Sequence, residues 1–203
     1  MYVPTPAIVT LRYKTNTISC FNEHDGNLEI LGIRIYRDLE NILNGGQAAL
    51  EQTIYAINMN NKRHLTDIPT PAEKEHLAPY THIYMPTQTD DRWPSLLYGT
   101  QGGIRDMLEA GYSVYREDLP PLHIMAFHYE LDFYAETITV TIPNGDKATY
   151  PFSKLVDIYD AWHSGLLWRQ TDHDELLAYQ APSPDNENYD EHPPHAACHC
   201  LHH

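Results

Sequence analysis

Basic side chains are scarce in this sequence. Its 203 residues include 13 Lys and Arg against 28 Asp and Glu, which gives a formal net charge of −15. The electrostatic field of such a molecule repels a phosphate backbone, which argues against direct binding of DNA or RNA. The charge instead favours a basic partner, although an acidic surface can also serve solubility alone.

Long apolar runs and a cysteine framework are also missing. No stretch approaches the roughly 18 apolar residues of a membrane span, and the opening "MYVPTPAIVTLRYK" lacks the basic region and apolar core of a secretory signal. Three cysteines, two of them in Cys-x-Cys, make a poor disulfide framework and agree with a reducing compartment. We therefore expect a soluble, cytoplasmic protein.

Phenylalanine is rare beside tyrosine, with four Phe against 15 Tyr. Hydrophobic residues nevertheless make up 42% of the chain, which is typical of a globular protein. Most of its large rings therefore have a polar tip and can lie half-buried at a surface. This composition suits a protein that presents tyrosines to a partner.

The first half of the chain predicts strands followed by helices. Residues 7–13, 17–21 and 28–36 have strand-like apolar patterns, so we expect an opening β-meander. From Asp38 the spacing becomes helical, and two helices joined at Gly45-Gly46 follow.

Local capping and turn signals place the later elements. Thr70, Pro71 and Glu73 occupy the N-cap, N1 and N3 positions of an expected short helix. The remaining expectations are a glycine-bounded helix at 102–110, a long alternating strand at 122–135, a hairpin around Asn144-Gly145, and helices from Ser153 and from Thr171 or Asp172.

Together these elements predict an α+β fold. We expect an antiparallel sheet, formed by the N-terminal meander and the 122–150 hairpin region, packed with several helices. A single domain would span residues 1–180, and residues 181–203 would form a Pro- and acid-rich linker with a His- and Cys-rich tail.

The end of the chain differs in charge from the rest. No Lys or Arg follows Arg169, and seven acidic residues are the candidate partner-binding groups: Asp172, Asp174, Glu175, Asp185, Glu187, Asp190 and Glu191. Their density predicts attraction to a basic surface.

Metal-ligating residues gather in the last twelve residues, "HPPHAACHCLHH". His192 with His195 and Cys198 with Cys200 form two pairs that can converge on one zinc ion if the backbone turns between them. Soft thiolates would also accept copper(I). The alternative is a terminus that binds metal opportunistically, since Cys-x-Cys is tighter than the usual zinc spacing.

A row of polar side chains on the long strand is the candidate catalytic site. His128, Glu130 and Asp132 alternate with apolar residues and so share one face. They suit a metal-dependent hydrolase or phosphodiesterase, either alone or with His82 or His123 as a further ligand, yet a solvent-facing row is the favoured interpretation. The settings of His82 and His123 do not match two-histidine phosphoesterases, because Tyr84 and Met125 stand where those enzymes have Ser or Thr.

Catalytic templates are otherwise missing, and Cys20 lies in a strand-like context that predicts a buried, inert thiol. The leading hypothesis is therefore a non-enzymatic acidic protein that binds a basic surface of another macromolecule. One version is a nucleic-acid mimic that inhibits a nucleic-acid-binding defence protein. The hydrolase and a structural metal-binding protein that uses the C-terminal tail are the alternatives.

Overall fold

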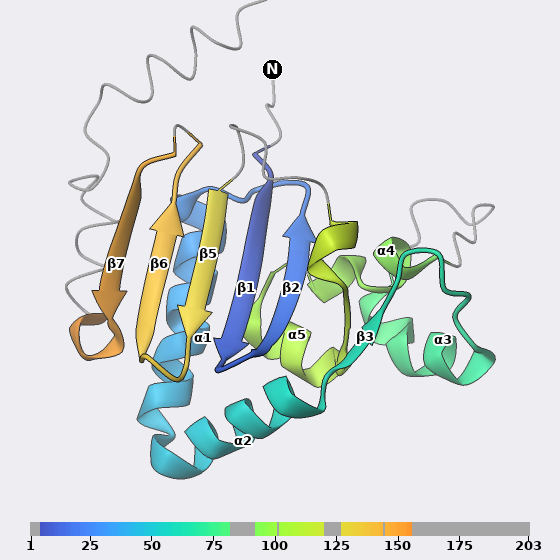
Figure 1. Cartoon of the computed structure of the whole chain (residues 1–203), viewed down its shortest axis with the longest axis horizontal. Helices are drawn as coiled ribbons and strands as arrows, with labels where there is room; N and C mark the ends of the chain where they lie inside the picture. The colour runs from blue at the N-terminus through green and yellow to red at the C-terminus, as the bar shows by residue number, and fades with distance from the viewer. Residues whose placement is uncertain (1–4, 82–91, 101, 120–126, 144, 156–203) are drawn as a thin grey trace, which may run out of the picture. The chain divides into compact units, whose positions relative to one another are not determined.

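A five-stranded mixed sheet is the centre of the fold (Figure 1). The computed structural model describes residues 5–81, 92–100, 102–119, 127–143 and 145–155. The strand order is β2-β1-β5-β6-β7, and a separate two-stranded sheet pairs β3 with β4. The strands are β1 (Ala7–Tyr13), β2 (Asn16–Asn22), β3 (Asn61–Arg63), β4 (Tyr112–Val114), β5 (Phe127–Asp132), β6 (Thr137–Thr141) and β7 (Lys147–Pro151).

The central pairing of the sheet is parallel, which corrects the prediction of an antiparallel sheet. β1 runs parallel to β5, with Ala7 opposite Phe127 and Arg12 opposite Asp132, whereas the other neighbours are antiparallel. Two antiparallel groups, β1–β2 and β5–β6–β7, thus join through their first strands. The α+β class is confirmed, but residue alternation identifies the faces of a strand and not its neighbours.

The expected third strand of the meander is helical, so that prediction was wrong. Residues Leu28–Gly32 form a π-helical turn (η1) that leads into α1 (Ile33–Asn44). The Asn27 side chain accepts a hydrogen bond from the backbone N–H of Ile30 and so caps the start. The buried residues of the segment recur at helical spacing and include Leu28, Leu31, Ile35 and Leu39.

The other helices largely follow the sequence signals. α2 (Gly46–Met59) follows α1 after Gly45, and Gly46 has φ +67°. α3 (Pro71–Leu77) has the expected capping box between Thr70 and Glu73. α4 (Trp93–Leu96) is a single turn, and α5 (Ile104–Ala110) ends at Gly111 in the left-handed conformation. The described residues also include four short 3-10 turns: η2 (Ala78–Tyr80), η3 (Tyr98–Thr100), η4 (Arg116–Asp118) and η5 (Phe152–Lys154).

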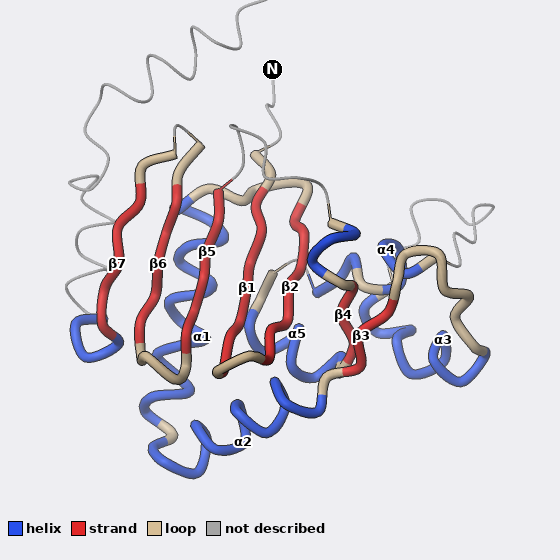
Figure 2. Tube along the Cα trace, in the orientation of Figure 1, coloured by secondary structure: helices blue, strands red, loops and turns tan. Residues whose placement is uncertain are grey.

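The main core lies between the sheet and the helices. α1 and α5 lie behind the sheet in Figure 1, and Figure 2 shows the same layering. Val9 and Tyr129 are paired in register and fully buried, as are Leu11 and Leu131. The Tyr129 hydroxyl donates a hydrogen bond to the Gly26 carbonyl at 2.9 Å, which satisfies a polar group inside the core.

A second hydrophobic cluster lies among α3, α4, α5 and β4. Its buried members are Leu77, Trp93, Leu96, Leu97, Ala110, Val114 and Leu119, and Phe21 of β2 packs against it. Because β2 is an edge strand, this cluster stands beside the free edge of the main sheet. This cluster and β2 both contribute residues to the lining of a cavity.

Several predicted elements lie outside the described residues. The β6–β7 hairpin is confirmed, but Asn144 at its turn is among the residues not described. The helix expected from Ser153 is described only through Leu155, and the helix expected from Thr171 or Asp172 is not described. The chain divides into two compact units, residues 1–167 and residues 168–203, and the second lies outside the described residues. No helix in the described ranges combines the length and apolar character needed to cross a membrane.

Candidate functional site

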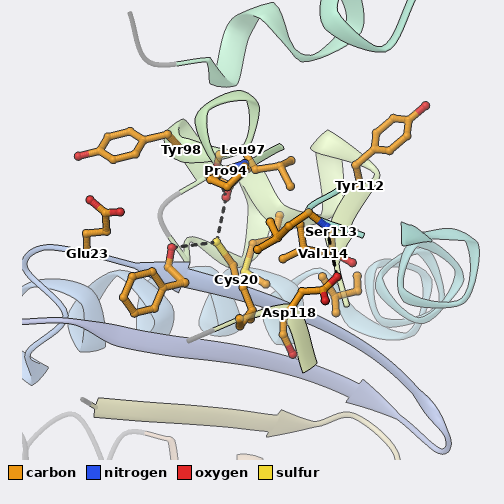
Figure 3. A pocket seen from close by; sticks show the side chains of 16 residues that line it. Cys20, Glu23, Pro94, Leu97, Tyr98, Tyr112, Ser113, Val114 and Asp118 are labelled. Carbon is orange, nitrogen blue, oxygen red and sulfur yellow. Dashed lines mark hydrogen bonds between the residues drawn. The ribbon is translucent and has the colours of Figure 1, made fainter. Parts of the chain in front are cut away.

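A cavity of about 410 Å³ lies along β2 (Figure 3). Its volume is within the range of roughly 300–1,000 Å³ that is typical of small-molecule pockets. One wall comes from β2, and the other walls come from the second hydrophobic cluster and the segments around it. The lining residues are Ile18, Ser19, Cys20, Phe21, Glu23, Leu65, Pro94, Leu97, Tyr98, Thr100, Met107, Tyr112, Ser113, Val114, Asp118 and Leu119.

Local chain reversals bring these walls together. Gly111 has φ +68°, which ends α5 and turns the chain into β4. β4 pairs with β3 rather than with β2, so the cavity wall at Tyr112–Val114 belongs to a separate sheet. The space beside β2 is therefore left to side chains, and most of these are apolar.

Cys20 contributes a protonated thiol to this cavity. Its Sγ lies 3.2 Å from the Thr100 hydroxyl and donates a longer hydrogen bond of 3.7 Å to the Phe21 carbonyl. Burial raises the pKa of the Cys20 thiol, and the hydrogen bond with Thr100 only partly opposes that effect. The thiolate is the nucleophilic form of cysteine, so this residue is poorly suited to nucleophilic catalysis. The Cys20 residue is half-buried rather than buried, and the prediction of an inert thiol stays a prediction.

The charged side chains among the described lining residues are carboxylates. Among the sixteen described lining residues, Glu23 and Asp118 are acidic and none is Lys, Arg or His. Asp118 accepts hydrogen bonds from the backbone N–H of Leu65 at 3.2 Å and pairs with His64 Nδ1 at 2.8 Å. Glu23 is exposed, and no ion pair within the described part of the chain engages it. The charged side chains among the described lining residues are thus negative.

Hydrogen-bonded side chains also link β2, β1 and β5 across the sheet. The Thr10 hydroxyl lies 3.2 Å from the Ser19 hydroxyl and 3.2 Å from His128 Nε2, so one threonine links β2 to β5. Thr10 and Ser19 are buried, and His128 is half-buried. Burial lowers the pKa of His128, although the Glu130 carboxylate acts in the other direction. The imidazole is therefore held in its neutral form.

The two carboxylates of the predicted catalytic row are engaged within the fold. Glu130 pairs with Arg12 at 2.6 Å, and Asp132 accepts hydrogen bonds from the backbone N–H groups of Tyr134 and Ala135, each at 2.9 Å. His128, Glu130 and Asp132 share a face as predicted, but each has a different structural partner. In the described residues no group of three or more His, Cys, Asp or Glu side chains could hold a metal ion.

No family model, curated protein or solved structure matches this chain. Functional inference must therefore come from the residues themselves. Two of the predicted sites lie outside the described residues and stay predictions. These are the metal ligands His192, His195, Cys198 and Cys200, and the partner-binding acids Asp172, Asp174, Glu175, Asp185, Glu187, Asp190 and Glu191.

The cavity was missed by the sequence analysis. Its lining comes from residues 18–23, Leu65, residues 94–100, Met107 and residues 112–119, which no local motif connects. Two features of the sequence pointed to parts of its lining. Gly111 indicated the end of a helix, and the apolar surroundings of Cys20 indicated a buried position. Neither signal indicates that β4 lies beside β2.

Proposed function

We propose that this chain is an acidic, non-enzymatic interaction protein that binds a basic surface of another macromolecule. The kind of surface that we infer is one that otherwise contacts nucleic acid. The observation that carries the proposal is the uneven distribution of charge along the chain. Residues 156–203 contain nine acidic side chains and one basic one, Arg169, whereas 12 of the 13 basic side chains precede residue 156.

The described arginines support this proposal because several are already paired within the fold. Arg12 contacts Glu130 at 2.6 Å, Arg63 contacts Glu73 at 2.8 Å, and Arg105 contacts Glu109 at 2.7 Å. Arg34 pairs with Asp106. Such partly exposed pairs add little stability, at most about 1 kcal/mol each. Their relevance is that these cations are less available to neutralise the acids after residue 155.

The chemistry of the described side chains also favours binding over catalysis. The Cys20 thiol is protonated, and His128 is neutral and hydrogen-bonded to Thr10. The Glu130 carboxylate is occupied by Arg12. A general base must reach the proton that it removes, and a nucleophile needs an activating neighbour. The described part of the chain does not assemble these features at one place.

Concentrated negative charge would act mainly on association. Complementary charge steers encounter and raises the association rate, and this effect weakens as salt screens the field. A mimic of nucleic acid would in addition compete with DNA or RNA for the same basic surface. Competition with nucleic acid therefore separates the mimic from a general acidic binder.

Two matched sets of substitutions test the proposal in the full chain. The first set changes Glu175, Asp185, Glu187, Asp190 and Glu191 to the corresponding amides. The second set, Glu29→Gln, Glu51→Gln, Glu75→Gln, Glu117→Gln and Glu136→Gln, changes five exposed side chains of the described part and alters the net charge equally.

The probe is a lysine- and arginine-rich DNA-binding domain, whose Kd is measured at low salt with and without competing duplex DNA. We expect the first set to weaken binding about tenfold, the second set to weaken it less than about threefold, and DNA to compete. Equal effects of the two sets would show that only net charge matters. That result, or the absence of binding, would overturn the proposal.

A further inference from the structure

The cavity along β2 has the size and lining of a ligand site, and its charge selects the class of ligand. The lining combines apolar walls with a few polar groups, which is the usual composition of a small-molecule pocket. An anionic ligand would meet Glu23 and Asp118 without any described basic side chain in the lining. Figure 3 shows Glu23 and Asp118 on different sides of the cavity, and each carboxylate would favour a cationic group beside it.

Aromatic side chains strengthen the preference for a cation. Phe21 and Tyr98 line the cavity, and Figure 3 shows Tyr98 and Glu23 together on one side of it. Tyr112 also lines the cavity, but its ring already lies 5.4 Å from the Arg63 guanidinium. Aromatic faces attract ammonium groups through the ring quadrupole. The apolar body of such a ligand would contact the side chains of Ile18, Leu97 and Val114.

We propose that this cavity binds a small hydrophobic amine, with the apolar part of the ligand inside the cavity and its ammonium group at the Glu23 carboxylate. Asp118 already pairs with His64 and with the Leu65 amide, so its role is to add negative potential. Glu23 is the carboxylate left for direct contact with the ligand. The described lining residues all precede residue 120.

Three probes of similar size but different charge test this proposal with the full chain. They are phenethylamine, phenethyl alcohol and phenylacetate, and their affinities are measured by calorimetry or ligand-observed NMR. We expect the amine to bind about fivefold more tightly than the alcohol, as one exposed ion pair allows, and phenylacetate to bind most weakly. Equal affinities, or no binding of any probe, would overturn the proposal.

Glu23→Gln and its matched control locate the ammonium group. Glu23→Gln should reduce the preference for amine over alcohol from about fivefold to less than about twofold, the part that Asp118 contributes, while the affinity for the alcohol stays unchanged. Glu29→Gln makes the same charge change at an exposed residue outside the lining and should leave the preference intact. A preference for the amine that stays near fivefold in Glu23→Gln would contradict the assignment.

Cys20 provides an independent readout of the location. In a variant with Cys198→Ser and Cys200→Ser, Cys20 is the remaining thiol, and its reaction with iodoacetamide can be followed by mass spectrometry. Bound phenethylamine should slow this reaction, because the Cys20 side chain lines the cavity. Binding that leaves the rate of Cys20 alkylation unchanged would place the ligand elsewhere and overturn the proposal.

Discussion

The neutral imidazole of His128 should make the free energy of unfolding depend on pH. Burial lowers the pKa of His128 in the folded protein below its ordinary value of about 6.5. At a pH between the folded and unfolded pKa values, the unfolded chain binds a proton that the folded chain does not. Stability is therefore fully present above the unfolded pKa and is lost as pH falls toward the folded pKa.

The perturbation is His128→Gln, which removes the titration and keeps a polar group near Thr10. A difference of one bound proton changes the free energy of unfolding by about 1.4 kcal/mol per pH unit. Below about pH 6.5, the difference in the free energy of unfolding between the unmodified protein and the variant should therefore decrease by up to about 1.4 kcal/mol for each pH unit. At pH 8 the two should differ by less than about 1.5 kcal/mol, the value of one hydrogen bond. Urea unfolding at several pH values measures both quantities.

The charged neighbours of His128 allow the cause of the shift to be checked. Burial is the largest cause of the shift. The Glu130 carboxylate raises the pKa of this imidazole, and the positive charges of Arg116, Arg12 and Lys147 lower it further. Glu130→Gln should therefore extend the loss of stability to lower pH. If the advantage of the unmodified protein over His128→Gln grew as pH fell, the imidazole would be charged in the fold and the reasoning from burial would be refuted.

Two further substitutions test the packing of the fold by urea unfolding. Tyr129→Phe removes the buried hydrogen bond to the Gly26 carbonyl and should cost about 1–2 kcal/mol, whereas Tyr55→Phe removes an exposed hydroxyl and should change stability little. No loss in Tyr129→Phe would contradict the role of that bond. Thr70→Ala breaks the capping box of α3 and should lower the free energy of unfolding by about 0.5–2 kcal/mol. The control Thr66→Ala changes an exposed residue and should leave stability almost unchanged. Equal effects of the two substitutions would argue against the role of the cap.

The elements that depend on neighbouring residues could be predicted from the sequence. The capping box at Thr70 and Glu73 and the glycine that ends α5 each involve residues within one turn. The β6–β7 hairpin likewise needs only a short turn between two alternating strands. Such local signals identify an element without knowledge of the rest of the fold.

The predictions that were wrong concern contacts between distant parts of the chain, or segments whose hydrophobic pattern fits both a strand and a helix. Residues 28–36 are densely apolar, and a short apolar run does not by itself distinguish a strand from a buried helix. The parallel pairing of β1 with β5 joins residues more than a hundred positions apart. That pairing also brings Arg12 to Glu130, so the engagement of a predicted catalytic carboxylate could not be foreseen.

The cavity illustrates the same limit for a functional site. Its walls come from two separate sheets and from turns between them, and the lining contains no sequence motif. The polar row on β5 was easier to find, because alternation alone puts His128, Glu130 and Asp132 on one face. Their partners, however, depend on which strand and turn lie beside them.

The salt dependence of binding tests the central proposal most directly. The measurement is the Kd between the full chain and a lysine- and arginine-rich DNA-binding domain across a series of salt concentrations. The proposal predicts that Kd rises steeply with salt and that amide substitution at Glu175, Asp185, Glu187, Asp190 and Glu191 flattens this slope. A Kd that is insensitive to salt, or a slope that these substitutions leave unchanged, would contradict it.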